Sequence, residues 1–285
     1  QVRKTGDILF NGVGVKSLLY EDEQFTLGFS NGMSKRFDRV CIATGSMKSS
    51  TLTQSIEDLG HTIEPLAPSL FAFDIKDERL KELAGIAVKN ASVRIPPKGK
   101  FQTGPVLITH RGLSGPSILK LSAWEARQFN ELNYEFQIEL NWLGDRNESD
   151  LQTLFSRLRN HHGQQLIKTK VFESLPKRLW EKILKHLKMS ETMQWAQLPK
   201  KMETELIQEL LSARFQVSGK TMNKEEFVTC GGVRLKEVNF KKMESRLIPN
   251  LYFAGECLDY DGITGGFNFQ GAWTTGYIAG TAMAE

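Results

Sequence analysis

Residues 251–280 read LYFAGECLDYDGITGGFNFQGAWTTGYIAG, and this stretch decides the fold class. Its first four residues are apolar and predict a short buried strand, which Gly255 and Glu256 end. A glycine-rich loop follows, and from Phe267 onward the pattern favours a helix. A strand, a glycine loop and a helix N-terminus in this order bring backbone N–H groups to one place. Such a place suits a polar or anionic group.

A second stretch, VCIATGS at residues 40–46, has the same design. It predicts a buried strand that ends at Thr44 and Gly45, although buried strands also end in glycine for structural reasons alone. In open α/β sheets, ligands bind beyond the carboxyl ends of the strands. Because the chain between the two stretches differs in character, we expect one sheet that an insertion interrupts.

The pattern along the chain therefore predicts an α/β fold with a β-rich insert. Asn31-Gly32 between alternating segments indicates a hairpin, and Ser114 or Gly115 before Pro116 indicates the start of a helix. Leucines and other apolar residues at helical spacing mark a helical subdomain. We expect a divided domain at 1–66 and 246–285, a β-rich inserted domain at 67–149 and 213–245, and the helical subdomain at 150–212.

Composition narrows the class of protein. The chain has 285 residues, of which 40% are hydrophobic and 25% charged, as in folded soluble proteins. Its three cysteines lack C-x-x-C spacing, which argues against a disulfide framework or a zinc site and favours a cytoplasmic location. No apolar run is long enough to predict a membrane span. The net charge of +4 suits an anionic ligand or RNA, but also an ordinary soluble surface.

Several side chains are candidates for chemistry. Glu256 can accept hydrogen bonds from ligand hydroxyls, or it is an exposed turn acid. Asp259 and Asp261 are expected to shape their loop rather than bind a metal, and no metal site is predicted. His110, in THRGLSGPS at 109–117, is a weak catalytic candidate that either moves a proton or is structural.

Other residues receive a structural interpretation. His61 and the pair His161-His162 are expected to be structural or solvated. Cys257 lacks the visible partner that a redox role requires. The C-terminal helical stretch carries Gly271, Gly276 and Gly280. Since glycine in a helix interior costs about 1 kcal/mol, these three predict a closely packed neighbour.

The stretch FAGECLDYDGITGGFNFQGAWTTGYIAG closely resembles the C-terminal signature of the BaiN/RdsA-like (YhiN, aminoacetone-oxidase-type) NAD(P)/FAD-dependent oxidoreductases of bacteria, an HI0933-like family. That signature reads G-E-x-L-D-x-x-G-x-x-G-G-Y-N-x-Q-x-A-x-x-S-G. Phe267 replaces the usual Tyr and Thr275 the usual Ser. Two further blocks agree, IATG…LGHTIEPLAPSL and THRGLSGPSILKLS. The signature itself is matched by Gly255, Glu256, Leu258, Asp259, Gly262, Gly265, Gly266, Asn268, Gln270, Ala272 and Gly276.

The resemblance implies a Rossmann-like FAD domain of the glutathione-reductase type, interrupted by a β-barrel-like domain with a small helical subdomain. It implies FAD as the cofactor, NAD(P)H as the reductant, and a C=C or C=N bond in an organic or RNA-base substrate. Thr44 and Gly45 would lie near the dinucleotide, and Glu256 near the ribityl chain or pyrophosphate. The remaining cofactor-binding residues would be Gly255, Gly262, Thr264, Gly265, Gly266, Phe267, Asn268 and Gln270.

The sequence departs from the family pattern in two places. The G-x-G-x-x-G unit that cradles a pyrophosphate is absent, because GVGVKS at 12–17 lacks the third glycine and falls in a strand pattern. The segment after Gly45 is short and lacks glycine. We therefore expect an N-terminally truncated flavoprotein with weak FAD affinity. The alternative is a non-catalytic binding or oligomerisation module with an empty FAD half-site.

Overall fold

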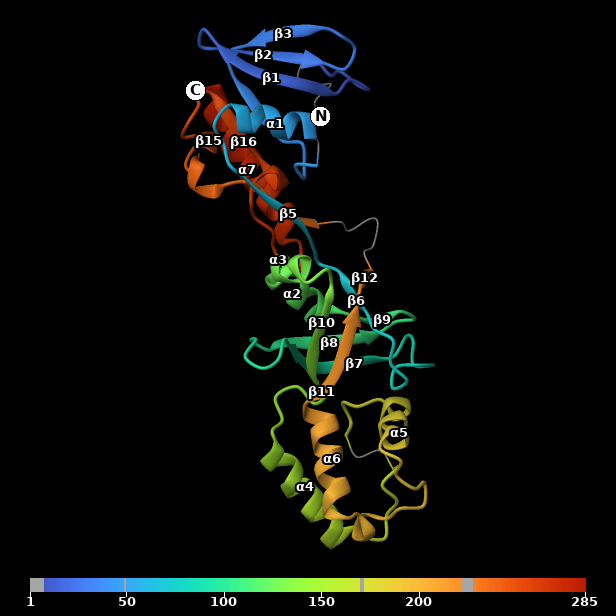
Figure 1. Cartoon of the computed structure of the whole chain (residues 1–285). Coiled ribbons are helices and arrows are strands. Elements are labelled where there is room, and N and C mark those ends of the chain that lie inside the picture. Colours follow the sequence, from blue (N-terminus) through green and yellow to red (C-terminus); the bar gives the residue numbers. More distant parts are fainter. Residues whose placement is uncertain (1–7, 49, 170–171, 222–227) are drawn as a thin grey trace. The chain divides into compact units, whose positions relative to one another are not determined.

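The computed structural model describes residues 8–48, 50–169, 172–221 and 228–285. The chain divides into two compact units. Unit 1 comprises residues 1–67 and 228–285, and unit 2 comprises residues 68–227. Figure 1 shows the elements of both units.

The described residues of unit 1 form three small sheets and two α-helices, of which α7 is the longer. A three-stranded sheet has the order β1-β2-β3, a pair is formed by β13 and β5, and a four-stranded sheet has the order β14-β15-β16-β4. The elements are β1 (Val15–Glu21), β2 (Gln24–Phe29), β3 (Ser34–Phe37), β4 (Val40–Ile42), α1 (Ser50–Asp58), β5 (Ile63–Ser69), β13 (Val228–Val233), η3 (Leu235–Glu237), β14 (Val238–Asn239), β15 (Glu244–Ser245), β16 (Leu251–Phe253), η4 (Gly255–Cys257) and α7 (Phe267–Ala284).

The strands β4 and β16 belong to one sheet, as the sequence predicts, and they are parallel neighbours in it. Val40 pairs with Leu251 and Ile42 with Phe253. All four side chains are buried, because a parallel pair is covered on both faces. The insertion between residues 42 and 251 therefore separates two strands of one sheet.

The hairpins of the N-terminal sheet follow from their turn residues. The turn between β2 and β3 contains Gly32, which has a φ of +82°, and Phe29 N–H donates to Met33 O at 2.9 Å. The predicted Asn31-Gly32 hairpin is thus confirmed. Leu18 on β1 is buried and lies beside α1, where its N–H donates to Ser55 Oγ at 3.3 Å.

Unit 2 is built around a curved seven-stranded sheet in the order β11-β10-β7-β8-β9-β6-β12. The two end strands follow one another in sequence and are separated by Gly219 alone. The sheet thus curls back on itself. Its two end strands do not pair with each other among the described residues, so the expected β-barrel is not closed. The strands are β6 (Ala72–Asp74), β7 (Ala87–Arg94), β8 (Gln102–Ile108), β9 (Gly112–Ser114), β10 (Glu135–Asn141), β11 (Ala213–Ser218) and β12 (Lys220–Thr221).

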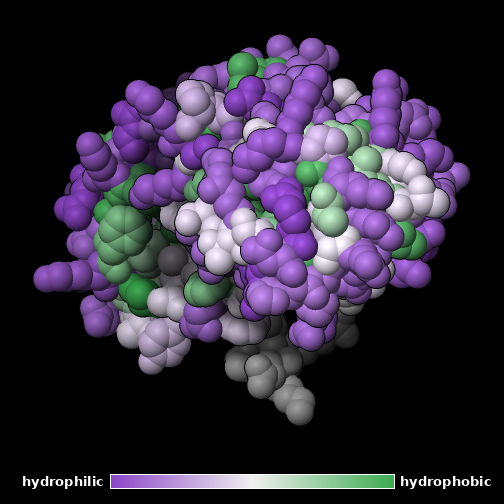
Figure 2. All heavy atoms as spheres, turned by 90° about the horizontal axis from the view of Figure 1, so that it is seen from below, coloured by the Kyte–Doolittle hydropathy of each residue, from purple (hydrophilic) through white to green (hydrophobic). Residues whose placement is uncertain are grey.

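The helices of unit 2 are α2 (Pro116–Trp124), α3 (Ala126–Glu131), α4 (Glu148–His161), α5 (Lys177–His186), η2 (Trp195–Gln197) and α6 (Lys200–Leu211). Those from α4 to α6 confirm the helical spacing predicted for residues 150–212. Asn147 begins α4 with a capping box that includes Asp150. Figure 2 views the molecule from the end where these helices lie in Figure 1, and that face is mostly hydrophilic.

One core cluster fills unit 2. Phe71, Phe73, Phe129 and Phe136 are buried beside one another, and the rings of Phe129 and Phe136 stack at 3.8 Å between centroids. A buried network around Arg79 joins the sheet to α6. Its guanidinium donates to Asp77, Glu209 and the Arg214 carbonyl.

Some boundaries differ from the sequence prediction. The N-cap of α2 is Gly115, one of the two residues predicted to start this helix, but the helix is divided at Glu125 into α2 and α3. Residues 228–245 pack with unit 1, although the sequence pattern groups them with the insert. Residues 222–227, which the sequence pattern also groups with the insert, lie outside the described residues. In the part that is described, no helix is long and apolar enough to cross a membrane.

Candidate functional site

The carboxyl ends of β4 and β16 form one edge of the four-stranded sheet. Thr44 and Gly45 follow β4, and Gly255 and Glu256 follow β16. The pairing continues past the strands, because Ala254 N–H donates to Ile42 O at 2.9 Å. The structure therefore brings together two of the predicted groups of site residues.

Gly45 and Glu256 are direct neighbours at this edge. A Cβ atom built on Gly45, whose φ is +71°, would lie 4.0 Å from Glu256 Oε2. The other carboxylate oxygen, Oε1, accepts a hydrogen bond from Thr229 N–H at 2.9 Å. Glu256 is thus a half-buried carboxylate with one oxygen held by the backbone of β13.

Helix α7 packs beside this edge through Ala272 and Thr275. Its N-cap is Gly266, which has a φ of +84°, and no side chain caps the helix. Thr275 joins α7 to the end of β16, because its hydroxyl accepts from Gly255 N–H at 2.9 Å and donates to Gly271 O at 2.7 Å. Gly265, Gly266 and Phe267 are exposed. The positive end of the helix dipole is therefore open to solvent.

The loop before α7 is closed by Asn268. Its Oδ1 accepts from Gly262 N–H at 2.7 Å, and its Nδ2 donates to Gly262 O at 3.0 Å. A Cβ atom on Gly262 would lie 2.8 Å from Phe267 Cβ. Asn268 and Gly262 therefore shape the loop. The two hydrogen bonds of the Asn268 amide explain why the C-terminal signature contains both residues. Gln270 is exposed and donates to Thr274 Oγ1 at 3.1 Å.

The helical glycines were predicted to pack against a close neighbour, and only one of the three does so. A Cβ atom on Gly271 would lie 2.5 Å from the Tyr260 hydroxyl. For Gly276 and Gly280, nothing among the described residues lies within 4 Å of such an atom. The prediction is wrong for these two positions. They belong to a helix that also exposes Phe269, Trp273 and Tyr277.

The sequence prediction missed Thr229. It lies on β13, in the segment TCGGV at 229–233, which the pattern indicated only as a strand. Gly231 and Gly232 have φ values of +101° and +133°. The adjacent glycines were the available signal, since such a pair marks a close backbone approach. We call Gly45, Ser46, Thr229 and Glu256 the Glu256 cluster.

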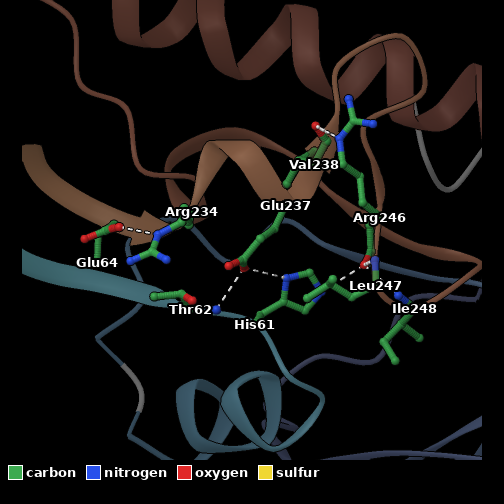
Figure 3. A network of polar contacts seen from close by, with 10 residues as sticks. His61, Thr62, Glu64, Arg234, Glu237, Val238, Arg246, Leu247 and Ile248 are labelled. Atoms are coloured by element: carbon green, nitrogen blue, oxygen red, sulfur yellow. Dashed lines mark hydrogen bonds and ion pairs between the residues drawn. The ribbon is translucent and has the colours of Figure 1, made fainter.

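A second polar cluster of unit 1 surrounds His61 (Figure 3). His61 Nε2 lies 2.9 Å from Ser245 Oγ, and Nδ1 lies 3.3 Å from Glu237 Oε2. Thr62 N–H donates to the same Glu237 oxygen at 2.8 Å. We call His61, Thr62, Glu237 and Ser245 the His61 cluster.

The His61 cluster has the residue types of a hydrolytic triad but not its chemistry. Ser245 Oγ accepts from the N–H groups of Leu247 and Ile248, both at 2.9 Å. Its own proton therefore goes to His61 Nε2, which leaves the imidazole proton on Nδ1, facing Glu237. The serine is buried and its lone pairs are used, so it is no nucleophile. The structural interpretation of His61 is confirmed.

The described residues offer neither a reactive cysteine in this unit nor a group of metal ligands. Cys257 is fully buried, and burial raises the pKa of its thiol to about 12. It is therefore a poor source of thiolate. Among the described residues, no group of three or more His, Cys, Asp or Glu side chains is placed to hold a metal ion.

His110 belongs to unit 2. It is exposed in the turn between β8 and β9. Its catalytic role is not part of the geometry of the Glu256 cluster and stays a prediction. Thr264 is half-buried in the loop before α7.

Comparisons with known proteins identify the family of this chain. The family model described as the HI0933-like protein barrel and H2TH domain matches residues 67–228. The ribosomal RNA dihydrouridine synthase of Escherichia coli is 34% identical over 273 residues, which cover 92% of this chain and 64% of that protein. The corresponding protein of Haemophilus influenzae is 29% identical over 236 residues, which cover 81% of this chain and 55% of that protein.

A third relative has a different printed activity. The 3-dehydro-bile acid delta(4,6)-reductase of Clostridium scindens is 27% identical over 293 residues, which cover 100% of this chain and 71% of that protein. The chain thus spans less than two thirds of the length of both dihydrouridine synthases.

Proposed function

The chain belongs to the HI0933-like family, and from that premise we propose that it is part of an FAD-dependent oxidoreductase. The observation that carries the proposal is the convergence of Gly45, Glu256 and helix α7 at one sheet edge, where Thr275 of α7 binds the Gly255 N–H. Carboxyl ends of parallel strands are where α/β folds bind dinucleotides. The names of the relatives, two dihydrouridine synthases and one reductase, support a redox reaction.

The residues at this edge fit FAD. The ribityl chain offers hydroxyl groups, and the Glu256 carboxylate accepts hydrogen bonds from such groups. The isoalloxazine ring accepts negative charge on reduction, and the open N-terminus of α7 favours negative charge. Gly45 leaves room beside Glu256 that a side chain would fill. When bound, the flavin supplies hydride transfer.

In this proposal, the residues of the chain have distinct tasks. Glu256 orients the ribityl hydroxyls, and the backbone at 265–267 stabilises charge on the ring. Asn268 keeps that backbone in place by its two hydrogen bonds to Gly262. NAD(P)H is the proposed reductant of the intact protein. The proposed substrate carries a polarised C=C or C=N bond, in an organic molecule or an RNA base.

A visible absorbance spectrum of the purified chain tests the proposal. The chain is measured after desalting, with and without added FAD, and any released chromophore is identified. A flavin band that survives desalting supports the proposal, and NAD(P)H oxidation is then measured. If FAD addition produces no bound flavin, the alternative holds, in which this chain is a non-catalytic binding or oligomerisation module.

An RNA substrate is the second part of the proposal, and the surface of α5 supports it. This helix buries Leu179, Trp180, Ile183 and Leu184 and has a mainly basic solvated face. That face and the residue after its C-cap expose Lys177, Arg178, Lys185 and Lys188, with Glu181 as the single exposed acid. Basic side chains on one face are the electrostatic footprint of phosphate binding.

Salt-dependent RNA binding tests this part. The double variant Lys185→Glu/Lys188→Glu is expected to lower affinity for structured RNA and to reduce the log–log salt slope by about 2. The matched control is Lys241→Glu/Lys242→Glu, an exposed pair of unit 1 that changes the net charge equally. Equal losses in both variants would show that only net charge matters and would remove α5 from the proposal.

A further inference from the structure

Thr229 holds one oxygen of the proposed cofactor carboxylate. Its N–H donates to Glu256 Oε1 at 2.9 Å, across 27 residues of sequence. The other oxygen, Oε2, is the one that faces Gly45. Because the bond comes from the backbone, it persists whatever the rotamer of the Thr229 side chain.

The Thr229 hydroxyl has no hydrogen-bond partner among the described residues. The residue is 3% exposed, and among the described residues no donor or acceptor reaches its Oγ1. Buried polar side-chain atoms are nearly always paired, because leaving one unpaired loses the bonds that it makes to water. Ser46 Oγ, next to Gly45, is also buried and unpaired. The Glu256 cluster thus contains two buried hydroxyl groups that the chain itself does not use.

The position of Thr229 is fixed by the two glycines that follow it. A Cβ atom on Gly231 would lie 2.3 Å from Pro65 O, and one on Gly232 would lie 2.4 Å from Cys257 O. Asp259 N–H also donates to Val233 O at 2.9 Å. β13 is therefore held against β5 on one side and against the turn that carries Glu256 on the other.

We propose that Thr229 is a further cofactor-binding residue, whose hydroxyl donates to an oxygen of the same polyhydroxyl chain that Glu256 orients. This inference rests on the proposed function. A carboxylate only accepts hydrogen bonds, whereas each hydroxyl of a ribityl chain both donates and accepts. A ligand hydroxyl that donates to Glu256 consequently needs a donor nearby. Rotation of the Thr229 side chain supplies one without loosening Glu256.

The test compares two substitutions of the same residue in the full chain. Thr229→Val keeps the shape and removes the hydroxyl, and Thr229→Ser keeps the hydroxyl. FAD affinity is measured by absorbance or fluorescence titration. Loss of one hydrogen bond predicts about tenfold weaker binding for Thr229→Val. Thr229→Ser is expected to restore most of the wild-type affinity.

Thermal unfolding without flavin is the second readout. Because the hydroxyl has no partner in the unliganded chain, Thr229→Val is expected to leave the unfolding midpoint unchanged or raise it. Thr281→Val is the matched control, since the Thr281 hydroxyl donates to Tyr277 O at 2.9 Å on exposed α7. That variant is expected to bind FAD as the wild type does.

Three outcomes of these measurements would overturn the inference. Equal FAD affinity of Thr229→Val and the wild type overturns the inference alone. A lower unfolding midpoint of unliganded Thr229→Val also overturns it, since the hydroxyl then has a structural partner. If the wild-type chain binds no FAD, the proposed function of this chain fails and the inference fails with it.

Discussion

The two polar clusters of unit 1 differ in how completely their hydrogen bonds are used. In the His61 cluster, the Ser245 hydroxyl makes three hydrogen bonds, and both imidazole nitrogens have partners. In the Glu256 cluster, two buried hydroxyl groups, those of Ser46 and Thr229, have no partner in the described part of the chain. A fully paired cluster contributes to stability, whereas unpaired groups beside a carboxylate point to a ligand. In our proposal, the difference separates a structural cluster from a ligand-binding one in the same unit.

The largest expected effect concerns the backbone that forms the Glu256 cluster. Gly232→Ala places a Cβ atom 2.4 Å from Cys257 O, at a φ of +133°. Overpacking against a backbone atom, together with this φ, is expected to lower the free energy of unfolding by about 3 kcal/mol or more. Urea denaturation measures it.

Gly276→Ala is the control for this substitution. Gly276 lies inside α7, with no neighbour near its Cβ position in the described part of the chain. Alanine there is expected to raise the free energy of unfolding by up to about 1 kcal/mol. A loss of stability at Gly276 equal to that at Gly232 would contradict the assigned close approach of β13.

The second prediction sets one hydroxyl of each cluster against the other. Ser245→Ala leaves His61 Nε2 and the N–H groups of Leu247 and Ile248 without their partner. It is expected to lower the free energy of unfolding by about 1–3 kcal/mol, whereas Thr229→Val is expected not to lower it. Urea denaturation of both unliganded variants makes the comparison. Equal losses would erase the distinction between the clusters.

The smallest effect is a pH dependence of the His61 cluster. Burial lowers the pKa of His61, although Glu237 acts in the opposite direction. The unfolded chain therefore binds a proton at a higher pH than the folded chain. The stabilisation is present above the unfolded pKa of about 6.5, and it is lost as the pH falls through the folded pKa. The slope for one proton is at most about 1.4 kcal/mol per pH unit.

Denaturation between pH 7.5 and pH 5 measures this slope, and His61→Gln is expected to remove it. The pKa of Glu237 is lowered as well: burial acts against the shift, and hydrogen bonds from Thr62 outweigh it. Its contribution is lost at lower pH, as the pH falls below the usual value for Glu. An unchanged slope in His61→Gln would assign the effect to another group.

Local pattern was sufficient to predict elements of both units. Apolar runs that end in small residues located β4 and β16. The different character of the chain between these two runs predicted that they share one sheet, which the structure shows. Asn31-Gly32 located a hairpin, and apolar spacing located α4 to α6. These features depend on neighbours in sequence or on a simple periodicity, so a single sequence contains them.

The features that the sequence did not predict depend on contacts between residues that are distant in sequence. Thr229 is 27 residues from Glu256, and nothing in its own segment indicates which acid it holds. The glycines of α7 look alike in sequence, yet Gly271 lies against Tyr260, whereas Gly276 and Gly280 face open space. The curl of the seven-stranded sheet at Gly219 likewise depends on strands at both ends of the insert.

The uneven burial of the five tryptophans gives this chain a built-in optical reporter. Trp142, Trp180 and Trp195 are each 1% exposed, whereas Trp124 and Trp273 are each 68% exposed. The variant Trp124→Phe therefore leaves Trp273, on α7, as the sole solvent-exposed indole. Its long-wavelength emission and its quenching by iodide would report what approaches this helix. Energy transfer to a flavin would reveal occupancy of the neighbouring sheet edge without any label.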